Sequence, residues 1–441
     1  MNIKTKQLTK FEFELFKQYS SHDILPIATA WKERILTQTS ATSVEITGEL
    51  RRCKASLSHI DFAVCSENVP LTNSEILSLP GIKQIVNQTR NFLEFKIQNE
   101  ISLLVWIAVP YEFPTALLYT TGPSSHTDWL DAVALQNGKK ISFHGCWENK
   151  HMVNMESETE IYRFLGLPFF SPEIRELNFD RDEIVELYFQ DLIEYDDIQS
   201  DLHVHTNWSD GRNSIEEMVC AAMKRNLSTI AITDHSPRVL RSRYDNADYF
   251  LSQHKEIDQI EKKHGHRITI LKGVEVDILP DGKLDLPVSI LQKMDIVVAS
   301  LHVDLDQPRS VITDRLIKAI ENPYVDIIGH PGGRLYPMHD TADLDWDRVF
   351  RAAAFHKVAL EINSHKAHPL FDDRKVRVAI ASGVPICLDS DAHSVDMIDQ
   401  SIFGINIARR AGLDKEQVIN TWSSVRLKNW LKRKNITARQ R

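Results

Sequence analysis

The sequence predicts an α/β protein whose second half is a β/α barrel, preceded by a distinct amino-terminal part. Short apolar runs alternate with amphipathic segments after residue 200, a pattern typical of parallel strands joined by helices. Residues able to bind metal follow most of those runs. Five of the 18 histidines precede residue 200 and thirteen follow it, so metal or proton chemistry is expected in the second part.

Composition limits the class of protein. With 441 residues, 42% hydrophobic and 26% charged, the chain is long enough for two or three ordinary globular domains. It contains no apolar run of about 18 residues, and its start is polar, so we expect neither a spanning helix nor a signal peptide. We therefore expect a cytoplasmic protein with reduced thiols at its five cysteines, and no contact with a membrane.

Charge argues against a chain covered in phosphate-binding surface, because the formal net charge is -9. The tail "RLKNWLKRKNITARQR" is basic throughout, and a solvated helix end is favoured over a nucleic-acid contact there. Residues 176–200 are strongly acidic and lack a strand pattern, which predicts a connecting segment. The expected organisation is an amino-terminal unit over 1–175, an acidic linker over 176–200 and a barrel domain over 201–441.

Apolar runs in the second part are the expected strands of the barrel. They are "STIAITDH", "ITILKGVEVDI", "DIVVASLH", "VDIIGHP", "VALEINS" and "VPICLDSDAH", together with the start of "DLHVHTNWSDG". Their continuous apolar character indicates strands buried on both faces. Segments between them, such as "SIEEMVCAAMKRNL" and "RSVITDRLIKAIEN", have helical periodicity and helix-capping starts.

Polar residues stand where these strands are expected to end. The carboxyl ends of parallel strands in a barrel meet on one face, so residues far apart in sequence would gather there. Any one of these histidines alone is better explained as a surface residue or a hydrogen-bonded core residue, but their repetition favours a metal site. The candidates are His203 and His205, Asp234 and His235, Glu275, His302, His330, and Asp391 with His393.

The spacing of His203 and His205 has a geometric reason. In an extended strand, residues i and i+2 point to the same side, so both imidazoles can face one ion. Thr206 to Gly211 would then form the turn that brings Asp210 over the mouth of the barrel.

The motifs "DLHVHTNWSDG", "ITDHS", "GVEVDILPDG", "ASLHV", "GHPGGR", "LEINS" and "SDAH", in this order, resemble the PHP (polymerase and histidinol phosphatase) superfamily of metal-dependent phosphoesterases. The resemblance spans roughly residues 198–432. It implies a distorted seven-stranded β/α barrel that holds up to three divalent ions. The implied ligands are His203, His205, Glu275 and Asp391 for one ion, Glu275, His302 and His330 for a second, and Asp210, His235 and His393 for the third.

The resemblance also implies the chemistry. A water that bridges two divalent ions loses its proton near neutral pH and can attack phosphorus, while the ions neutralise phosphate oxygens. Glu275, Asp391 and His302 are the expected catalytic residues, with Glu275 as the bridging carboxylate. Arg334 could clamp a phosphate, although an exposed loop arginine is an equal alternative. Mixed imidazole and carboxylate ligands suit Zn, Mn or Fe.

The first part resembles the palm and thumb of bacterial family X DNA polymerases, which carry a PHP domain after the thumb. "VEITGELRRCKASLSHIDFAV" corresponds to the palm, whose family pattern is Gly-Ser, an Arg pair and then Asp-x-Asp. "VPYEFPTALLYTTGPSSHTDWLDAVALQNGKKIS" and "ESETEIYRFLGLPFFSPEIRE" continue the match. An α+β unit is therefore expected, and the two resemblances together cover about residues 22–432.

Departures from the polymerase pattern fall on its catalytic positions. Glu49 stands where the family has a serine, His59 replaces the first catalytic aspartate, Asp61 keeps the second, and the third aligns with Val105. One aspartate cannot hold the two Mg²⁺ ions of nucleotidyl transfer. Only about 20 residues precede the match, too few for the family's lyase segment. We therefore expect a degenerate, truncated polymerase part without polymerase activity.

Three functional hypotheses follow from the sequence. The first is a metal-dependent nuclease, resembling a 3′-5′ exonuclease, or a nucleotide phosphoesterase, with single-stranded DNA or nucleotides as candidate substrates. In it the amino-terminal part would hold substrate or a protein partner. The second is a small-molecule phosphatase resembling histidinol phosphatase. The third is a scaffold with a structural metal cluster, which nine ligands make less favoured because structural zinc usually needs four.

Overall fold

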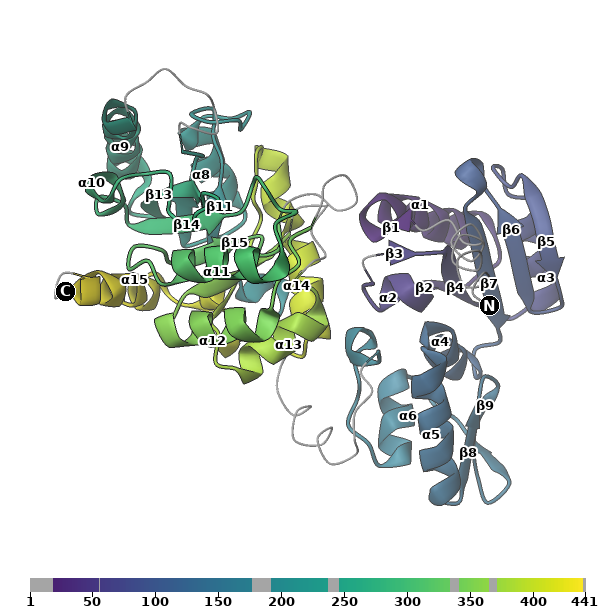
Figure 1. Ribbon diagram of the computed structural model, residues 1–441. Coiled ribbons are helices and arrows are strands. Elements are labelled where there is room, and N and C mark those ends of the chain that lie inside the picture. The colour runs from purple at the N-terminus through teal and green to yellow at the C-terminus, as the bar shows by residue number, and fades with distance from the viewer. Residues whose placement is uncertain are drawn as a thin grey trace, which may run out of the picture. The chain divides into compact units, whose positions relative to one another are not determined.

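A computed structural model describes residues 19–54, 56–176, 192–236, 246–333, 341–364 and 371–438 (Figure 1). The chain divides into two compact units, Met1–Phe189 and Gln190–Arg441. Most of the expected acidic linker lies outside the described residues, so the boundaries 1–175, 176–200 and 201–441 stay a prediction.

The first unit is built on a five-stranded sheet. Its strands, in spatial order, are β2 (Ser43–Thr47), β4 (His59–Cys65), β7 (Ser102–Ala108), β6 (Phe92–Lys96) and β5 (Gln84–Gln88). Only β4 and β7 are parallel, and the other neighbours are antiparallel. This mixed sheet is the α+β arrangement that the sequence predicts. A short pair, β1 (Tyr19–Ser20) with β3 (Ser56–Leu57), and the turns α2 (Gly48–Arg51) and η1 (Gln98–Glu100) complete it.

Helices α1 (Ser21–Gln38) and α3 (Val69–Leu77) cover one face of this sheet. Helix α1 presents Ala28, Trp31 and Ile35 to the sheet at helical spacing, and Phe62 and Val105 of the strands pack in the same core. All five side chains are buried. The sheet and these helices therefore form a conventional hydrophobic core.

The rest of the first unit is a small α+β subdomain. It contains α4 (Phe113–Thr121), α5 (Ser124–Gln136), α6 (Glu158–Leu165) and η2 (Pro172–Ile174). An antiparallel sheet of β8 (Lys139–Ser142), β9 (Gly145–Glu148) and β10 (His151–Val153) accompanies the helices. Ser157 caps α6 through the amide of Glu160, and Gly166 ends it at a φ of +76° that favours glycine.

The second unit is a barrel of seven parallel strands in the order of the chain. Consecutive strands pair in parallel, and the first strand meets the last through a bridge between Val204 and Ala392, which nearly closes the ring. The strands are β11 (Ser200–Val204), β12 (Thr229–Ile232), β13 (Thr269–Asp277), β14 (Ile296–Ser300), β15 (Ile327–Gly329), β16 (Ala359–Asn363) and β17 (Ile386–Asp389). The predicted α/β barrel is confirmed.

Helices link the strands, as the alternation predicts. A capping box between Ser214 and Glu217 starts the first of them, in which one apolar face packs on the sheet. The helices are α8 (Ile215–Lys224), α9 (Asn246–His264), α10 (Val288–Leu291), α11 (Arg309–Ile320), α12 (Trp346–His356), α13 (Asp373–Ala381) and α14 (Ser401–Arg410). Shorter turns η3 (Tyr195–Asp197), η4 (Val395–Gln400), η5 (Lys415–Gln417) and η6 (Ile419–Thr421) complete the unit.

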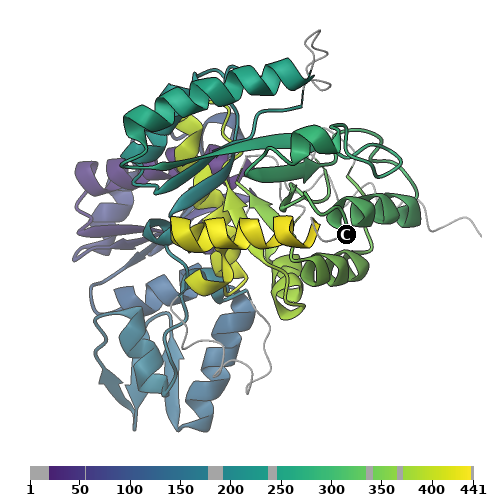
Figure 2. The ribbon, with the colours of Figure 1, turned by 90° about the vertical axis from the view of Figure 1, so that its left-hand side faces the viewer.

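The carboxyl-terminal helix α15 (Ser424–Ala438), yellow in Figure 2, packs against the amino end of the barrel. Ser424 contacts Thr229, the first residue of β12, at 2.8 Å. Leu427 and Leu431 join an apolar cluster with inward-facing strand residues such as Leu202 and Ile296. The basic tail thus starts as a helix whose apolar side closes the barrel at the end opposite the strand carboxyl termini.

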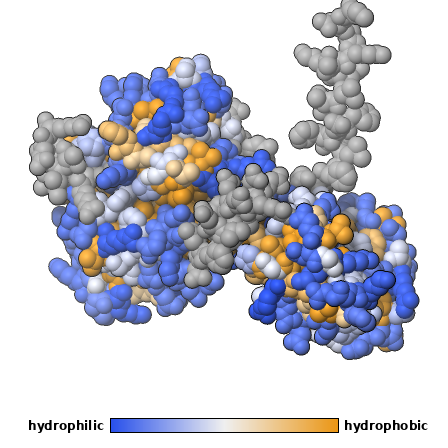
Figure 3. All heavy atoms as spheres, turned by 90° about the horizontal axis from the view of Figure 1, so that it is seen from below, coloured by the Kyte–Doolittle hydropathy of each residue, from blue (hydrophilic) through white to orange (hydrophobic). Residues whose placement is uncertain are grey.

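Among the described residues, no helix is long and apolar enough to cross a membrane. Hydrophilic side chains cover most of the face shown in Figure 3, with apolar patches between them. The five cysteines are free thiols, and Cys65, Cys146 and Cys387 are buried.

We predict that Leu427→Ala destabilises the barrel by about 2–5 kcal/mol, because a fully buried leucine is replaced by a cavity. Urea denaturation followed by circular dichroism measures this change. Val425→Ala on the same helix is the control: Val425 is 71% exposed, so its free energy of unfolding should change by no more than about 0.5 kcal/mol. Equal effects of the two substitutions would contradict the packing role of α15.

Candidate metal centre

The carboxyl ends of the barrel strands carry a connected cluster of imidazoles and carboxylates. Strands β11 and β13 contribute His203 and Glu275 from within, and β12, β14, β15 and β17 are followed by further ligand residues just after they end. All nine predicted ligand positions lie among the described residues and contact one another: His203, His205, Asp210, His235, Glu275, His302, His330, Asp391 and His393.

His203 and His205 point to the same place, as their spacing predicts. Their Nε2 atoms lie 3.2 Å apart. Asp391 Oδ1 lies 3.6 Å from the first Nε2 and 3.0 Å from the second. Two imidazole nitrogens and a carboxylate oxygen so arranged form a group that could hold one metal ion.

Glu275 is the most connected side chain of the cluster, and it is fully buried. Its Oε1 lies 3.0 Å from His330 Nε2 and 3.3 Å from His302 Nε2, and its Oε2 lies 2.8 Å from His235 Nδ1. His203 is within 3.5 Å. A carboxylate with both oxygens shared in this way has the geometry of a bridging ligand.

Asp210 lies at the mouth, where its side chain is 42% exposed. Its Oδ2 is 3.3 Å from His393 Nε2 and 3.5 Å from His235 Nε2, and its Oδ1 is 3.7 Å from His205 Nδ1. These four residues form a second possible metal-binding group.

The turn that carries Asp210 is held by Asp234. The Asp234 carboxylate accepts the amide of Thr206 at 2.7 Å, the Thr206 hydroxyl at 2.6 Å and the side-chain amide of Gln253 at 2.7 Å. Asp234 was one of the candidates at the strand ends, but its carboxylate oxygens accept the hydrogen bonds that hold this turn. It belongs to none of the possible metal-binding groups among the described residues.

The grouping of ligands differs from the division that the resemblance implies. His205 lies with the Asp210 group as well as with His203 and Asp391, and His235 lies with Glu275 and His302. His330 contacts Glu275 but falls outside these groups. Which residues share which ion therefore stays a prediction.

The pKa shifts within the cluster favour the binding of cations. Burial alone would raise the pKa of Glu275, but the neighbouring His235, His302 and His203 hold it well below its usual range. Burial likewise opposes protonation of His235, yet Glu275 and Asp210 raise its pKa to about 10. Burial lowers the pKa of His205 to about 3, which leaves a neutral imidazole able to bind metal. The carboxylates thus favour positive charge at the centre.

Two of the candidate ligands have a strained backbone. His330 has φ of +29° and Asp391 has φ of +51°, values that non-glycine residues adopt at a cost of about 1–3 kcal/mol. Such conformations persist where surrounding contacts hold them. Gly329, next to His330, has no room for a side chain, since a Cβ there would lie 2.4 Å from Ser300 Oγ.

Outer contacts fix the imidazole orientations. Glu361 Oε1 lies 2.7 Å from His203 Nδ1, and Asp277 hydrogen-bonds to His302 Nδ1. Because a carboxylate can only accept, each Nδ1 carries the proton and each Nε2 is available as a ligand. Neither Glu361 nor Asp277 was among the predicted site residues. The sequence feature that could have identified Glu361 is an acidic residue inside an otherwise apolar strand, "VALEINS".

The palm sheet carries a different polar row. Asp61 Oδ2 lies 3.1 Å from His59 Nε2. On the neighbouring strand β7, the residue paired with Asp61 is Leu104. On the next strand, β6, the residue paired with Leu104 is Glu94. Val105, the residue aligned with the third catalytic aspartate, pairs with Phe62 and is buried in the core on the other face, so it could not share a site with Asp61.

Glu49 stands where the family has a serine, and neighbouring residues contact both of its carboxylate oxygens. Its Oε1 lies 2.8 Å from Lys54 Nζ, and its Oε2 accepts the amide of Ser58 at 3.3 Å. Burial raises its pKa, but the contacts with Lys54 outweigh this and lower it.

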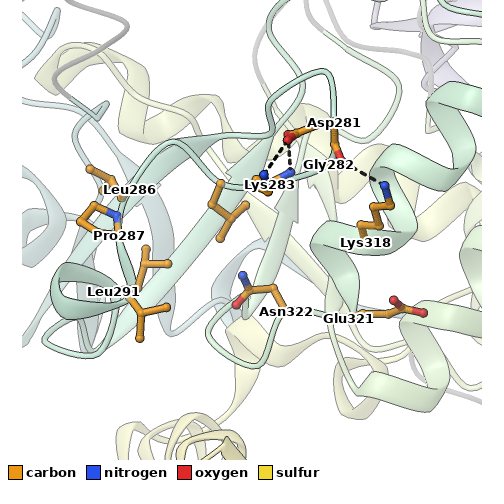
Figure 4. Close-up of a pocket in the computed structure, with 11 residues that line it drawn as sticks. Asp281, Gly282, Lys283, Leu286, Pro287, Leu291, Lys318, Glu321 and Asn322 are labelled. Atoms are coloured by element: carbon orange, nitrogen blue, oxygen red, sulfur yellow. Dashed lines mark hydrogen bonds and ion pairs between the residues drawn. The ribbon is translucent and has the colours of Figure 1, made fainter.

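Arg334, the predicted phosphate clamp, lies outside the described residues. A separate cavity of about 540 Å³ is lined by residues that follow β13 and by the end of α11 (Figure 4). Asp281 pairs there with Lys283 at 3.1 Å, and its carbonyl accepts Lys318. None of the nine candidate ligands lines this cavity.

Comparisons with known proteins agree with this geometry. The PHP domain family matches residues 201–365, and the DNA polymerase beta thumb family matches residues 116–176. The second unit is thus a PHP domain, and the protein is a metal-dependent phosphoesterase.

Relatives extend over both units. The DNA polymerase/3′-5′ exonuclease PolX of Bacillus subtilis (strain 168) is 34% identical over 415 residues, covering 93% of this chain and 72% of that protein. The chain belongs to the PolX family of bacterial family X DNA polymerases that carry a PHP domain.

Other relatives match the second unit. A probable phosphatase of Caldanaerobacter subterraneus subsp. tengcongensis is 37% identical over 257 residues, covering 54% of this chain and 92% of that protein. One from Thermoanaerobacter sp. (strain X514) is 35% identical over 248 residues, covering 53% and 94%. A solved structure of Leishmania infantum polymerase beta aligns at TM-score 0.33 and 16% identity over 38% of this chain and 79% of that one, too weakly to support an argument.

We predict that divalent ions stabilise chelator-treated protein. An ion that binds only the folded state adds about 2.7 kcal/mol at a concentration 100-fold above its Kd. Adding Mn²⁺ or Zn²⁺ should therefore raise the melting temperature, measured by calorimetry, and His205→Ala should remove most of that rise.

His264→Ala is the matched control, because His264 contacts Glu216 outside the cluster. It should respond to ions like the wild type. An equal rise in all three proteins would show that the ions bind elsewhere.

Proposed function

We propose that this protein is a 3′-5′ exonuclease or nucleotide phosphoesterase that hydrolyses phosphoesters at a centre of up to three divalent ions. The observation that carries the proposal is the continuous cluster of nine imidazole and carboxylate residues joined through Glu275. Structural sites need about four ligands, so a cluster of this size favours catalysis over a scaffolding role.

Divalent ions bound here would lower the pKa of water, neutralise phosphate oxygens and stabilise the leaving oxygen. The protein's own side chains would orient them. Glu275 would lie between ions and Asp391 would complete the inner site. His302, whose side chain is 11% exposed, lies close enough to the mouth to meet a substrate. Zn, Mn and Fe all suit this mixed donor set.

Two observations bear on the substrate. The PolX relative, whose name states a 3′-5′ exonuclease, aligns over both units, which favours single-stranded DNA or nucleotides. The probable phosphatases align with the barrel alone at similar identity, and they support a small-molecule phosphatase as the second candidate. The amino-terminal unit would then hold substrate or a protein partner, and a cytoplasmic location suits both candidates.

We predict that the metal-loaded protein shortens end-labelled single-stranded DNA from its 3′ end faster than it hydrolyses mononucleotides, sugar phosphates or histidinol phosphate. His203→Ala should lower the rate more than about 100-fold, because loss of even an outer contact to a metal ligand costs about 10–100-fold. Initial rates on each substrate give the comparison, with His264→Ala as the control.

A preference for the small phosphoesters would favour the second candidate. No hydrolysis of any substrate by metal-loaded protein, with His203→Ala losing only stability, would instead favour the scaffold.

The same proposal excludes nucleotidyl transfer. Two Mg²⁺ ions need several carboxylate oxygens, whereas Asp61 is paired with His59 and Leu104 is its partner on β7. Glu94 stands two strand spacings, roughly 10 Å, away.

The arginine pair of the palm is also engaged inside the unit. Arg51 Nη2 lies 2.6 Å from Glu158, and Arg52 Nε lies 2.7 Å from Glu176. These ion pairs neutralise the positive charge of the two arginines that would otherwise contact the phosphates of a nucleoside triphosphate.

We predict no template-dependent nucleotide incorporation by the wild-type protein with Mg²⁺ or Mn²⁺. A primer-extension assay should give the same background for wild type and Asp61→Ala, with the Bacillus subtilis PolX polymerase as positive control. Incorporation above that background by the purified wild-type protein would overturn this part of the proposal.

A further inference from the structure

Strand β16 differs from the other six strands of the barrel. Each of the others ends at, or leads into, at least one of the nine candidate ligands, whereas β16 supplies none of them. Its carboxyl end carries two polar residues instead, Glu361 and Asn363. Glu361 is fully buried and Asn363 is 5% exposed, so both lie inside the cluster region away from water.

Glu361 contacts ligand segments on both sides of its strand. Its Oε1 accepts a hydrogen bond from His203 Nδ1 at 2.7 Å. Its Oε2 accepts the main-chain amide of His330 at 2.5 Å and the side-chain amide of Asn363 at 2.9 Å. One buried carboxylate thus receives three donors, two of which belong to candidate ligands.

The contact with His203 decides which nitrogen of that ring can bind metal. The proton stays on Nδ1, and the free electron pair of Nε2 faces Glu275 and Asp391, 3.5 and 3.6 Å away. Without this acceptor, the ring could take the other tautomer or rotate away.

The contact with His330 acts on the backbone. His330 has a φ of +29°, a conformation that needs outside support. A charge-assisted hydrogen bond from its amide to Glu361 supplies such support, and such bonds are about twice as strong as neutral ones.

Asn363 continues the same network to a third ligand. Its side-chain amide also lies 3.3 Å from Asp391 Oδ2. Glu361 and Asn363 therefore connect the segments after β15 and β17 with β11, which together bear His203, His330 and Asp391.

We infer that Glu361, fastened by Asn363, is a positioning residue that sets the orientation of His203 and His330 and thereby the metal affinity and ligand geometry of the centre. The inference rests on the proposed metal centre and names a role outside the nine ligands. Glu361 touches no reacting atom, so its effect is expected on metal binding before catalysis.

The test is Glu361→Gln in the full-length protein. Glutamine keeps the size of the side chain but has one acceptor oxygen, so at least one of the three donors would face an amide NH₂ group. Affinity for Co²⁺, measured by titration of chelator-treated protein, should fall about 10–100-fold. The visible absorption spectrum of bound Co²⁺, which reports ligand geometry, should change as well.

Asp326→Asn is the matched control. Asp326 is a buried carboxylate just before the amino end of β15, where it accepts the amide of Val297 at 3.0 Å, at the end of the strand opposite the candidate ligands. This variant also replaces a buried acid by an amide, so it should lose stability while keeping the Co²⁺ affinity and spectrum of the wild type.

The outcomes separate the two proposals. Wild-type protein that binds no divalent ion would overturn the metal centre and this inference together. A wild-type protein that binds Co²⁺, with the same affinity and spectrum in Glu361→Gln, would overturn the inference alone. If Glu361→Gln does not fold, Asn363→Ala decides: unchanged affinity and spectrum overturn the inference, and a weaker, altered site supports it.

Discussion

A single buried carboxylate, Glu275, is the interaction on which the candidate centre depends. Five imidazoles lie within 3.6 Å of its two oxygens, and they come from four different segments of the chain. Removing one partner of a buried charged group costs several kcal/mol, so neither the carboxylate nor the imidazoles could be stable there separately. The parallel barrel makes this arrangement possible, because it brings all strand ends to one mouth.

The rest of the second unit holds that mouth in shape. Apolar contacts of α15 close the amino end of the barrel. Hydrophobic packing therefore lies at that end, and the candidate metal ligands lie at the carboxyl end. Around the cluster, buried acids that bind no ion in our proposal keep the ligands in place. Asp234 fixes the turn bearing Asp210, while Glu361 and Asp277 fix imidazole rings. The geometry of the candidate centre therefore depends on charged residues that surround the nine ligands.

The first unit keeps the core of the palm sheet, while polar residues on its other face depart from the pattern of the family that the sequence resembles. The core of the palm sheet is intact, with Phe62 and Val105 packed under α1. Its polar row has changed, since His59 pairs with Asp61 and Leu104 is the neighbour on β7. Val105, aligned with the third catalytic aspartate, does not share the face of Asp61, because successive residues of a strand point to opposite faces. Fold resemblance alone therefore cannot carry polymerase function to this chain.

The sequence alone predicted the barrel and its strands, because buried parallel strands have a continuous apolar pattern, and i, i+2 spacing fixes the side on which His203 and His205 point. The full set of nine candidate ligands came from the resemblance of its motifs to the PHP superfamily. Only the tertiary structure decided which of these residues meet. In the structure, His205 lies with Asp210, and Asp234 hydrogen-bonds to a turn. Glu361 accepts hydrogen bonds from both His203 and His330. Periodicity specifies the face of one strand, but distances between strands depend on barrel closure, loop path and rotamer, none of which a linear pattern contains.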